Sequence, residues 1–300
     1  MERVASCRLP PGYRRIASTI GSIRDEKDCL MTVTVRPLHS GVRWNEINFP
    51  PFSEAASRDT YFPTDTHEEA LSRLLYLTES HERCGVLTGD SGSGKTTVFF
   101  RLETLLRRSG MKVQRIDLAG ASESTLLHRL AIAVGLNPSD GLSAESMIND
   151  LELVFTAAGR VQHPWVLLLD HADRLRPGAL AAVEQVLHLA ANAGAVLLFA
   201  TRPEGRSSLL KILGGHSGLR IELTPLESAE MGAYLDDSLE RGMVSTIQFS
   251  RDAVQLMARI SQGNMRQINR LSRAACLAAA ADHRSEIDSE LLLTVSRELT

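Results

Sequence analysis

The most informative stretch of this sequence is Gly89-Asp90-Ser91-Gly92-Ser93-Gly94-Lys95-Thr96. It fits the pattern G-x-x-x-x-G-K-[ST], which is typical of loops that wrap a polyphosphate with backbone N–H groups. Glycine permits the unusual dihedral angles of such a loop and lets its backbone approach the ligand closely. We therefore predict that Lys95 reaches the β- and γ-phosphates of a nucleotide and that the Thr96 hydroxyl holds Mg²⁺. The predicted binding segment extends to Thr97.

The residues on both sides of this loop favour the same interpretation, because the motif works between a buried strand and a helix. The preceding run Cys84–Thr88 is short and mostly apolar, as expected of a central parallel strand. After the loop, apolar residues recur at helical spacing from Val98 to Leu106, and Gly110 indicates where the helix ends. The positive end of that helix would point at the phosphates.

Strand and helix patterns alternate along the first part of the chain, which predicts a parallel sheet covered by helices on both faces. Strands are expected at residues 84–88, 112–118, 165–170, 195–200 and 219–223. A helix capped by Thr66 precedes the first strand, and others are expected at residues 122–134, 144–158, 178–191 and 207–213. After Pro225 the strand patterns stop, and helices are expected at residues 228–241, 251–260, 265–281 and 286–299.

These patterns divide the chain into three expected parts. Residues 1–48 mix Arg, Pro, Gly and Ser with little periodicity and are expected to form a poorly ordered N-terminal arm. Residues 49–225 are expected to form the nucleotide-binding α/β domain, and residues 226–300 a small all-helical domain. The break near Thr224 and Pro225 is the predicted domain boundary.

The composition excludes some classes of protein. A hydrophobic content of 43% and a charged content of 23% are ordinary for a soluble globular protein. A net charge of −3 does not support binding to nucleic acid by overall charge, although a local basic patch is compatible with it. No apolar run approaches the roughly 20 residues of a membrane helix, so we expect no membrane insertion. The 4 cysteines lack metal-ligand spacing, and a reducing cytoplasm is the expected setting.

A second group of candidate residues follows the apolar run at residues 165–169. Asp170 ends this run, in the Walker-B position, where a carboxylate is expected to bind Mg²⁺ at the carboxyl edge of the sheet. His171 comes next, and its imidazole is a candidate weak base. Asp173 either supplies a carboxylate instead or caps the following turn. The structural alternatives are a helix-capping role for Asp170 and a spacer role for His171.

Three further polar residues are candidates for the catalytic machinery. Thr201 ends the fourth predicted strand and either orients the attacking water or simply terminates the strand. Arg220, on the last strand, is a candidate finger that reaches the nucleotide of a neighbouring subunit, with a surface arginine as the alternative. Arg266 begins a helix of the C-terminal domain, from which it either reaches the γ-phosphate or remains on the surface.

Together these segments resemble the AAA+ ATPases, and within them the ExeA-type ATPases of general secretion. The resemblance runs from about residue 51 to residue 299 and rests on the ordered combination of segments. They are Pro51-Phe52-Ser53, Glu68-Glu69-Ala70-Leu71, the loop at residues 89–97, Leu167-Leu168-Leu169-Asp170, Leu219-Arg220-Ile221, Leu223-Thr224-Pro225-Leu226 and Ser261-Gln262-Gly263-Asn264-Met265-Arg266-Gln267-Ile268-Asn269.

The resemblance implies a three-layer α/β sandwich with a five-stranded sheet in the order 5-1-4-3-2 and a C-terminal helical lid. It implies ATP as the nucleotide, Mg²⁺ as the ion, and a homo-oligomer that hydrolyses ATP while acting on a protein partner. Thr201 and Arg266 take the sensor positions of the family. ExeA-type ATPases continue into a membrane span and a wall-binding domain, which have no counterpart here, so a direct role in a secretion pore is not expected.

One departure from the family keeps two alternatives open. His171 stands where many ATPases of this architecture have Glu, which puts the rate of hydrolysis in doubt but not nucleotide binding. One alternative is an ATP-loaded module that assembles on DNA, as the transposition-helper ATPases do. The near-neutral charge does not favour it. The other alternative is a scaffold that binds ATP without hydrolysing it.

Overall fold

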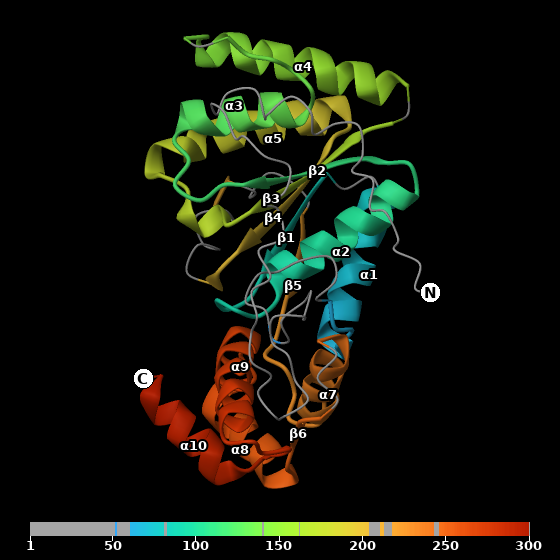
Figure 1. The fold of residues 1–300 in the computed structure, drawn as a ribbon. Coiled ribbons are helices and arrows are strands. Elements are labelled where there is room, and N and C mark those ends of the chain that lie inside the picture. The colour runs from blue at the N-terminus through green and yellow to red at the C-terminus, as the bar shows by residue number, and fades with distance from the viewer. Residues whose placement is uncertain are drawn as a thin grey trace, which may run out of the picture. The chain divides into compact units, whose positions relative to one another are not determined.

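The computed structural model describes residue 52 and residues 61–80, 83–139, 141–161, 163–203, 211–212, 218–242 and 246–299 (Figure 1). The expected N-terminal arm, residues 1–48, lies outside this part of the chain, as does most of the helix expected at residues 207–213.

A five-stranded parallel sheet forms the centre of the α/β part, in the order β2-β3-β4-β1-β5. This confirms the predicted fold class and strand order. The strands are β1 (Cys84–Thr88), β2 (Lys112–Asp117), β3 (Trp165–Asp170), β4 (Val196–Thr201) and β5 (Gly218–Glu222). Because all five are parallel, their carboxyl ends meet at one edge of the sheet, where open α/β sheets bind ligands.

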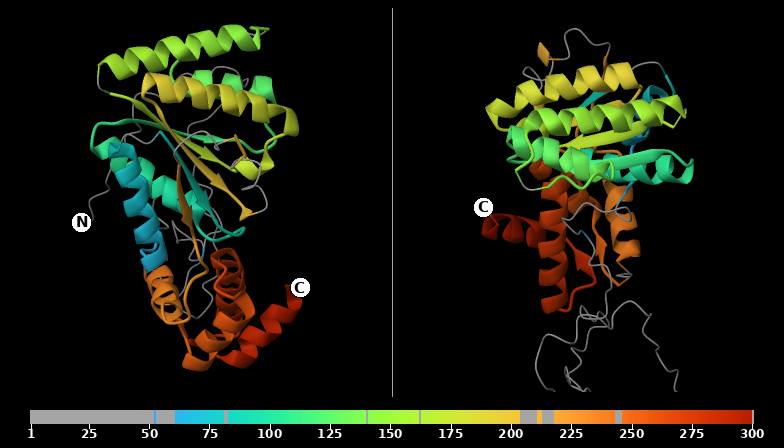
Figure 2. Two further views of the ribbon diagram at one scale, coloured as in Figure 1. Left: turned by 180° about the vertical axis from the view of Figure 1, so that it is seen from behind. Right: turned by 90° about the horizontal axis from the view of Figure 1, so that it is seen from above.

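Helices cover both faces of this sheet, and alternate residues along each strand face the two layers. Leu167 and Leu169 of β3 pack with α3 (Glu123–Ala133), α4 (Ala144–Arg160) and α5 (Leu180–Ala193). Val166 and Leu168 pack on the other side with α1 (Asp65–Glu79) and α2 (Lys95–Arg108). Helices α3, α4 and α5 lie together on one side of the sheet, with α4 outermost (Figure 2). Buried side chains on both faces explain why the strand reads as a continuous apolar run.

The first helix begins earlier than the sequence suggested. Thr64, not Thr66, is the N-cap residue of α1, and its side-chain oxygen accepts a hydrogen bond from the His67 amide. The Thr66 hydroxyl instead lies 3.0 Å from the Thr224 hydroxyl. Two threonines two positions apart are equally good caps by type, so sequence alone could not choose between them.

Helices α7 (Met231–Arg241), α8 (Arg251–Ser261), α9 (Met265–Ala281) and α10 (Ser289–Glu298) form a second buried cluster. The expectation of an all-helical segment was wrong, because β6 (Gln248–Phe249) and β7 (Glu286–Ile287) pair in parallel. The helix expected from Glu286 therefore begins at Ser289, with Asp288 as its cap. Two-residue strands are too short to leave a periodic pattern. We call residues 226–299 the helical lid.

The two clusters meet near the predicted domain boundary. Leu223 packs with the sheet and α1, whereas Leu226 packs with the lid helices. Phe52 also belongs to the lid cluster, where its ring meets Phe249 edge-on. Among the helices of the described residues, none is long and apolar enough to span a bilayer.

Candidate functional site

The glycine-rich loop connects the carboxyl end of β1 to the first turn of α2. Gly94 is the N-cap residue in the left-handed region, with φ 95°, and it offers no side chain to the free N–H groups of α2. Free N–H groups and the positive end of the helix dipole make this terminus an anion site. Residues 89–97 are therefore placed as a phosphate loop requires.

Lys95 folds back over this loop. Its ammonium Nζ donates hydrogen bonds to the carbonyl oxygens of Gly89 and Asp90, at 2.6 and 2.8 Å. Burial lowers the pKa of Lys95, whereas the charges of Asp173, Asp170 and Asp90 act in the opposite direction. The lysine and these carboxylates therefore share one electrostatic environment at the edge of the sheet.

Asp170 ends β3 with a side chain that is only 1% exposed. One carboxylate oxygen, Oδ1, accepts a hydrogen bond of 2.9 Å from the His171 amide. The other, Oδ2, is buried and has no hydrogen-bond partner among the described residues. The nearest cation is the Arg115 guanidinium, 3.8 Å away, which is too far for a hydrogen bond. A buried carboxylate oxygen without a donor is suited to a cation.

His171 lies beside Asp170 in the left-handed region, with φ 56°, which is uncommon for a residue that is not glycine. Its ring Nδ1 lies 2.9 Å from Oδ1 of Asp117, at the end of β2. An ionised carboxylate only accepts, so Nδ1 carries the proton and Nε2 is the acceptor of a neutral ring. Burial acts to raise the pKa of Asp117, but hydrogen bonds from the Ala119 amide and the His171 ring outweigh it and hold that pKa below its usual value.

Thr201 and Asp173 lie at the same edge of the sheet. Thr201 is fully buried at the end of β4, in register with Thr88 at the end of β1. Asp173 receives the Nε–H of Arg202 at 2.7 Å. Burial acts to raise the pKa of Asp173, yet its pairing with Arg202 outweighs burial and lowers it. Asp173 is therefore an ionised partner of Arg202 rather than the cap of a turn.

The lid reaches the phosphate loop through the first turn of α9. The Arg266 guanidinium donates to the Ser91 hydroxyl at 2.6 Å, and the Asn264 amide donates to the Ser91 carbonyl at 2.7 Å. Gly92 has a φ of 89°, and an added Cβ would collide with the Asn264 side chain. Glycine is thus required there both by its conformation and by the close approach of the lid.

Arg220, a candidate catalytic residue from the sequence, does not lie at the phosphate loop. It lies opposite Val86 in the middle of β5, the edge strand next to β1, and its side chain is exposed. This placement leaves it on the outer surface of the sheet.

Sequence reasoning missed four residues that contact the site: Asp117, Arg115, His67 and Asn264. Asp117 could have been recognised from the sequence, because it is an acidic residue at the end of a strand, as Asp170 is. The others gave no such signal. The Arg115 guanidinium is held over the Phe100 ring at 4.1 Å, and such a contact depends on two elements meeting in space.

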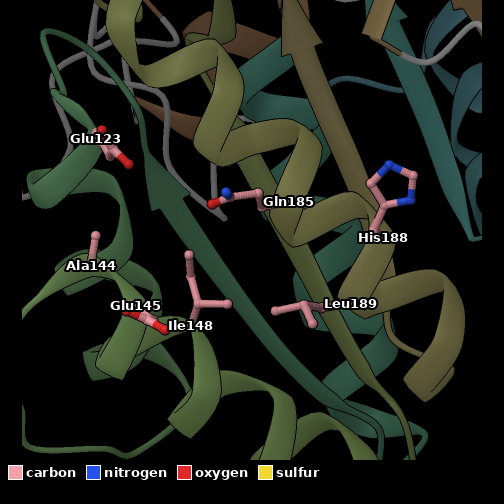
Figure 3. Close-up of a pocket in the computed structure, with 7 residues that line it drawn as sticks. All are labelled: Glu123, Ala144, Glu145, Ile148, Gln185, His188 and Leu189. Atoms are coloured by element: carbon pink, nitrogen blue, oxygen red, sulfur yellow. The ribbon is translucent and has the colours of Figure 1, made fainter.

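A separate hollow lies away from the loop, among the helices of one layer (Figure 3). It has a volume of about 540 Å³ and combines apolar residues with acidic ones from α3 and α4. Its lining residues are Glu123, Ala144, Glu145, Ile148, Gln185, His188 and Leu189. None of them belongs to the predicted site.

Comparisons with known proteins agree with this fold. Residues 78–210 match the family described as "AAA domain". The chain is 31% identical over 245 residues to the general secretion pathway protein A of Aeromonas hydrophila, covering 77% of this chain and 43% of that protein. The chain thus spans less than half the length of this relative.

Solved structures of similar fold have lower identity. Cdc6p of Pyrobaculum aerophilum superposes with a TM-score of 0.61 and 21% identity, over 82% of this chain and 70% of the other. A Walker-type ATPase of Pyrococcus abyssi gives 0.58 and 14%, over 83% and 76%. The Thermotoga maritima RuvB Holliday junction branch migration motor gives 0.53 and 15%, over 83% and 73%. The match over residues 78–210 and the similarity to the general secretion pathway protein A together identify a AAA-family P-loop domain in this chain, and the solved structures agree with its fold.

Proposed function

We propose that the site binds Mg-ATP and hydrolyses it to ADP and phosphate. The observation that carries this proposal is the joint placement of Lys95 and Asp170. The ammonium lies on the anion-binding loop, and the buried carboxylate at the end of β3 is close enough to influence its pKa. A cationic group for the phosphates and an anionic group for the metal therefore stand at one edge of the sheet.

The residues present fit a magnesium ion. Asp170 Oδ2 is buried without a hydrogen-bond donor among the described residues, and Thr96 is half-buried in the first turn of α2. Carboxylate and hydroxyl oxygens are the ligands that Mg²⁺ accepts, together with water and phosphate. When bound, the ion neutralises part of the phosphate charge.

We assign the role of base to His171. A water oxygen attacks the γ-phosphorus, and the bond from that phosphorus to the bridging oxygen breaks, with its electron pair staying on ADP. The proton of the water moves to Nε2 of His171, whose Nδ1–H is held by Asp117. We assign to Thr201, at the end of β4, the role of orienting the water. We assign to Arg266, on the lid, the role of contacting the γ-phosphate when ATP is bound.

Replacing His171 with alanine is expected to lower turnover about 100-fold while leaving the Kd for ATP unchanged, because a base contributes to the chemical step alone. Phosphate release and ATP titration of the same preparation measure the two quantities. His188→Ala, which removes a histidine on α5, is the matched control. Unchanged turnover in His171→Ala would remove His171 from the mechanism. Wild-type protein that binds ATP without any turnover would support the scaffold alternative instead.

We further propose that the chain works as a homo-oligomer in which Arg220 contacts the nucleotide of a neighbouring copy. Its exposed position on the edge strand supports this role. Arg220→Ala is expected to lower turnover at least about tenfold at concentrations where the chain assembles, with no change in ATP affinity. Arg108→Ala, at the exposed end of α2, is the control. Turnover per chain that is independent of concentration and unaffected by Arg220→Ala would contradict this proposal.

We propose that the ATP cycle acts as a switch on a protein partner, with residues 49–225 as the nucleotide-binding domain and residues 226–300 as the lid. The contacts of Asn264 and Arg266 with Ser91 support this division, because they connect lid position to loop conformation. A net charge of −3 does not favour DNA as the partner. The cytoplasmic location expected from the sequence remains a prediction.

A further inference from the structure

His67 lies behind the phosphate loop and is 96% removed from solvent, with a relative exposure of 4%. It belongs to the first turn of α1, and its ring Nε2 lies 2.9 Å from the carbonyl oxygen of Ser93. A carbonyl oxygen only accepts, so Nε2 carries the proton and donates it. Nδ1 is buried and has no hydrogen-bond partner in the described part of the chain. Among the described residues, the ring therefore hydrogen-bonds to the phosphate loop alone.

This hydrogen bond fixes the peptide plane between Ser93 and Gly94. In a trans peptide the C=O and N–H groups point in opposite directions. With the Ser93 carbonyl held toward His67, the Gly94 N–H is turned to the other side of the loop. The ring also fills the space behind the backbone, since a Cβ on Gly94 would lie 2.5 Å from Nε2. His67 thus determines how the Ser93–Gly94 peptide is oriented and how closely the loop backbone can approach α1.

The other loop carbonyls are held differently. Those of Gly89 and Asp90 accept from the Lys95 ammonium, and that of Ser91 accepts from Asn264 of the lid. If the Lys95 ammonium turns toward the phosphates, it loses its hydrogen bonds to the Gly89 and Asp90 carbonyls. If the lid opens, the hydrogen bond between Asn264 and the Ser91 carbonyl is lost. The His67 bond is buried beneath the loop, so neither movement competes with it.

The backbone of His67 is itself anchored. Its amide donates to the Thr64 hydroxyl at 3.1 Å, which caps α1. The neighbouring Asp65 amide donates to the Glu230 carboxylate at 3.1 Å, and the Thr66 hydroxyl meets that of Thr224. The first turn of α1 is therefore fixed both to Thr224, just before the lid, and to Glu230 of the lid, which keeps the ring in place under the loop.

We propose that His67 is a positioning residue for ATP binding: it holds the Ser93 carbonyl away from the phosphates so that the loop amides face them. The proposal rests on the proposed function, because it assumes that the loop binds a nucleotide. Carbonyl oxygens repel phosphate oxygens, so a loop free to turn this peptide binds ATP more weakly.

The test compares Mg-ATP affinity in three variants of the 300-residue chain by calorimetry. His67→Leu keeps an apolar side chain of similar size but removes the donor, and is expected to weaken binding about tenfold. His67→Gln keeps an N–H donor and is expected to stay within about threefold of wild type. Leu71→Ala, one turn further along α1, is the control. It is expected to lower the melting temperature without changing the affinity.

A second measurement is made on the wild-type protein and does not depend on the folding of His67→Leu. In protein labelled with ¹⁵N-histidine, the His67 ring is expected to show a proton on Nε2 and none on Nδ1, with the resonance identified through His67→Gln. A proton on Nδ1 alone would overturn the proposal. Wild-type affinity in His67→Leu would also overturn it while leaving ATP binding intact. A wild-type protein that binds no ATP would overturn the proposed function as well.

Discussion

Lys95→Ala is expected to weaken Mg-ATP binding and to reduce phosphate release by at least about 100-fold. In the proposed site the Lys95 ammonium neutralises the β- and γ-phosphates, and it already lies on the loop through its hydrogen bonds to the Gly89 and Asp90 carbonyls. Alanine leaves these phosphates without a counter-charge in a partly buried site. Calorimetric titration and a phosphate-release assay measure the two effects.

The control for this change is Lys112→Ala. Lys112 lies on β2, where its ammonium stands 5.6 Å from the centre of the Trp165 ring, and it does not contact the loop. Both variants remove one positive charge, so only the position differs. Equal loss of binding in the two variants would show that net charge, rather than the loop lysine, determines affinity.

Asp170→Asn is expected to lower turnover about 100-fold while ATP alone still binds. The amide has nearly the same shape as the carboxylate, but it lacks the charge that binds a divalent ion. Oδ2 of Asp170 forms an ion pair of 3.8 Å with Arg115 but has no hydrogen-bond donor among the described residues, and we expect this oxygen to bind the ion. Turnover measured against magnesium concentration should show the loss most clearly.

Asp236→Asn on the exposed face of α7 is the matched control and should behave as wild type. ATP titrations with and without magnesium complete the comparison. The wild type should bind more tightly with the ion, and Asp170→Asn should lose that difference. If Asp170→Asn hydrolyses ATP at the wild-type rate, the metal is held elsewhere.

The sequence was sufficient for the fold because its strongest signals are local. The run at residues 165–170 is buried on both faces, and such a strand reads as continuous apolar sequence whatever surrounds it. The phosphate loop is a pattern of residue types at fixed spacing. By contrast, β6 and β7 have two residues each, and they depend on pairing between residues 38 positions apart, as from Gln248 to Glu286. No local pattern could therefore predict them.

The candidate site was only partly predictable for a related reason. The positions of Lys95 and Asp170 follow from the loop and the strand that carry them. The partners of His171 and Ser93 do not, because Asp117 and His67 reach them from other elements. The sequence showed that an imidazole stands after Asp170, whereas the structure adds the carboxylate that orients it. Contacts of this kind require the tertiary arrangement.

Titration of Mg-ATP into the 300-residue chain tests the central proposal most directly. We expect saturable heat from wild-type protein and none from Lys95→Ala at the same concentrations, because we propose that the loop amides and this ammonium form the phosphate site. Absence of any heat from wild-type protein at millimolar Mg-ATP would contradict nucleotide binding at residues 89–97. Equal heat from both proteins would place the nucleotide at another site.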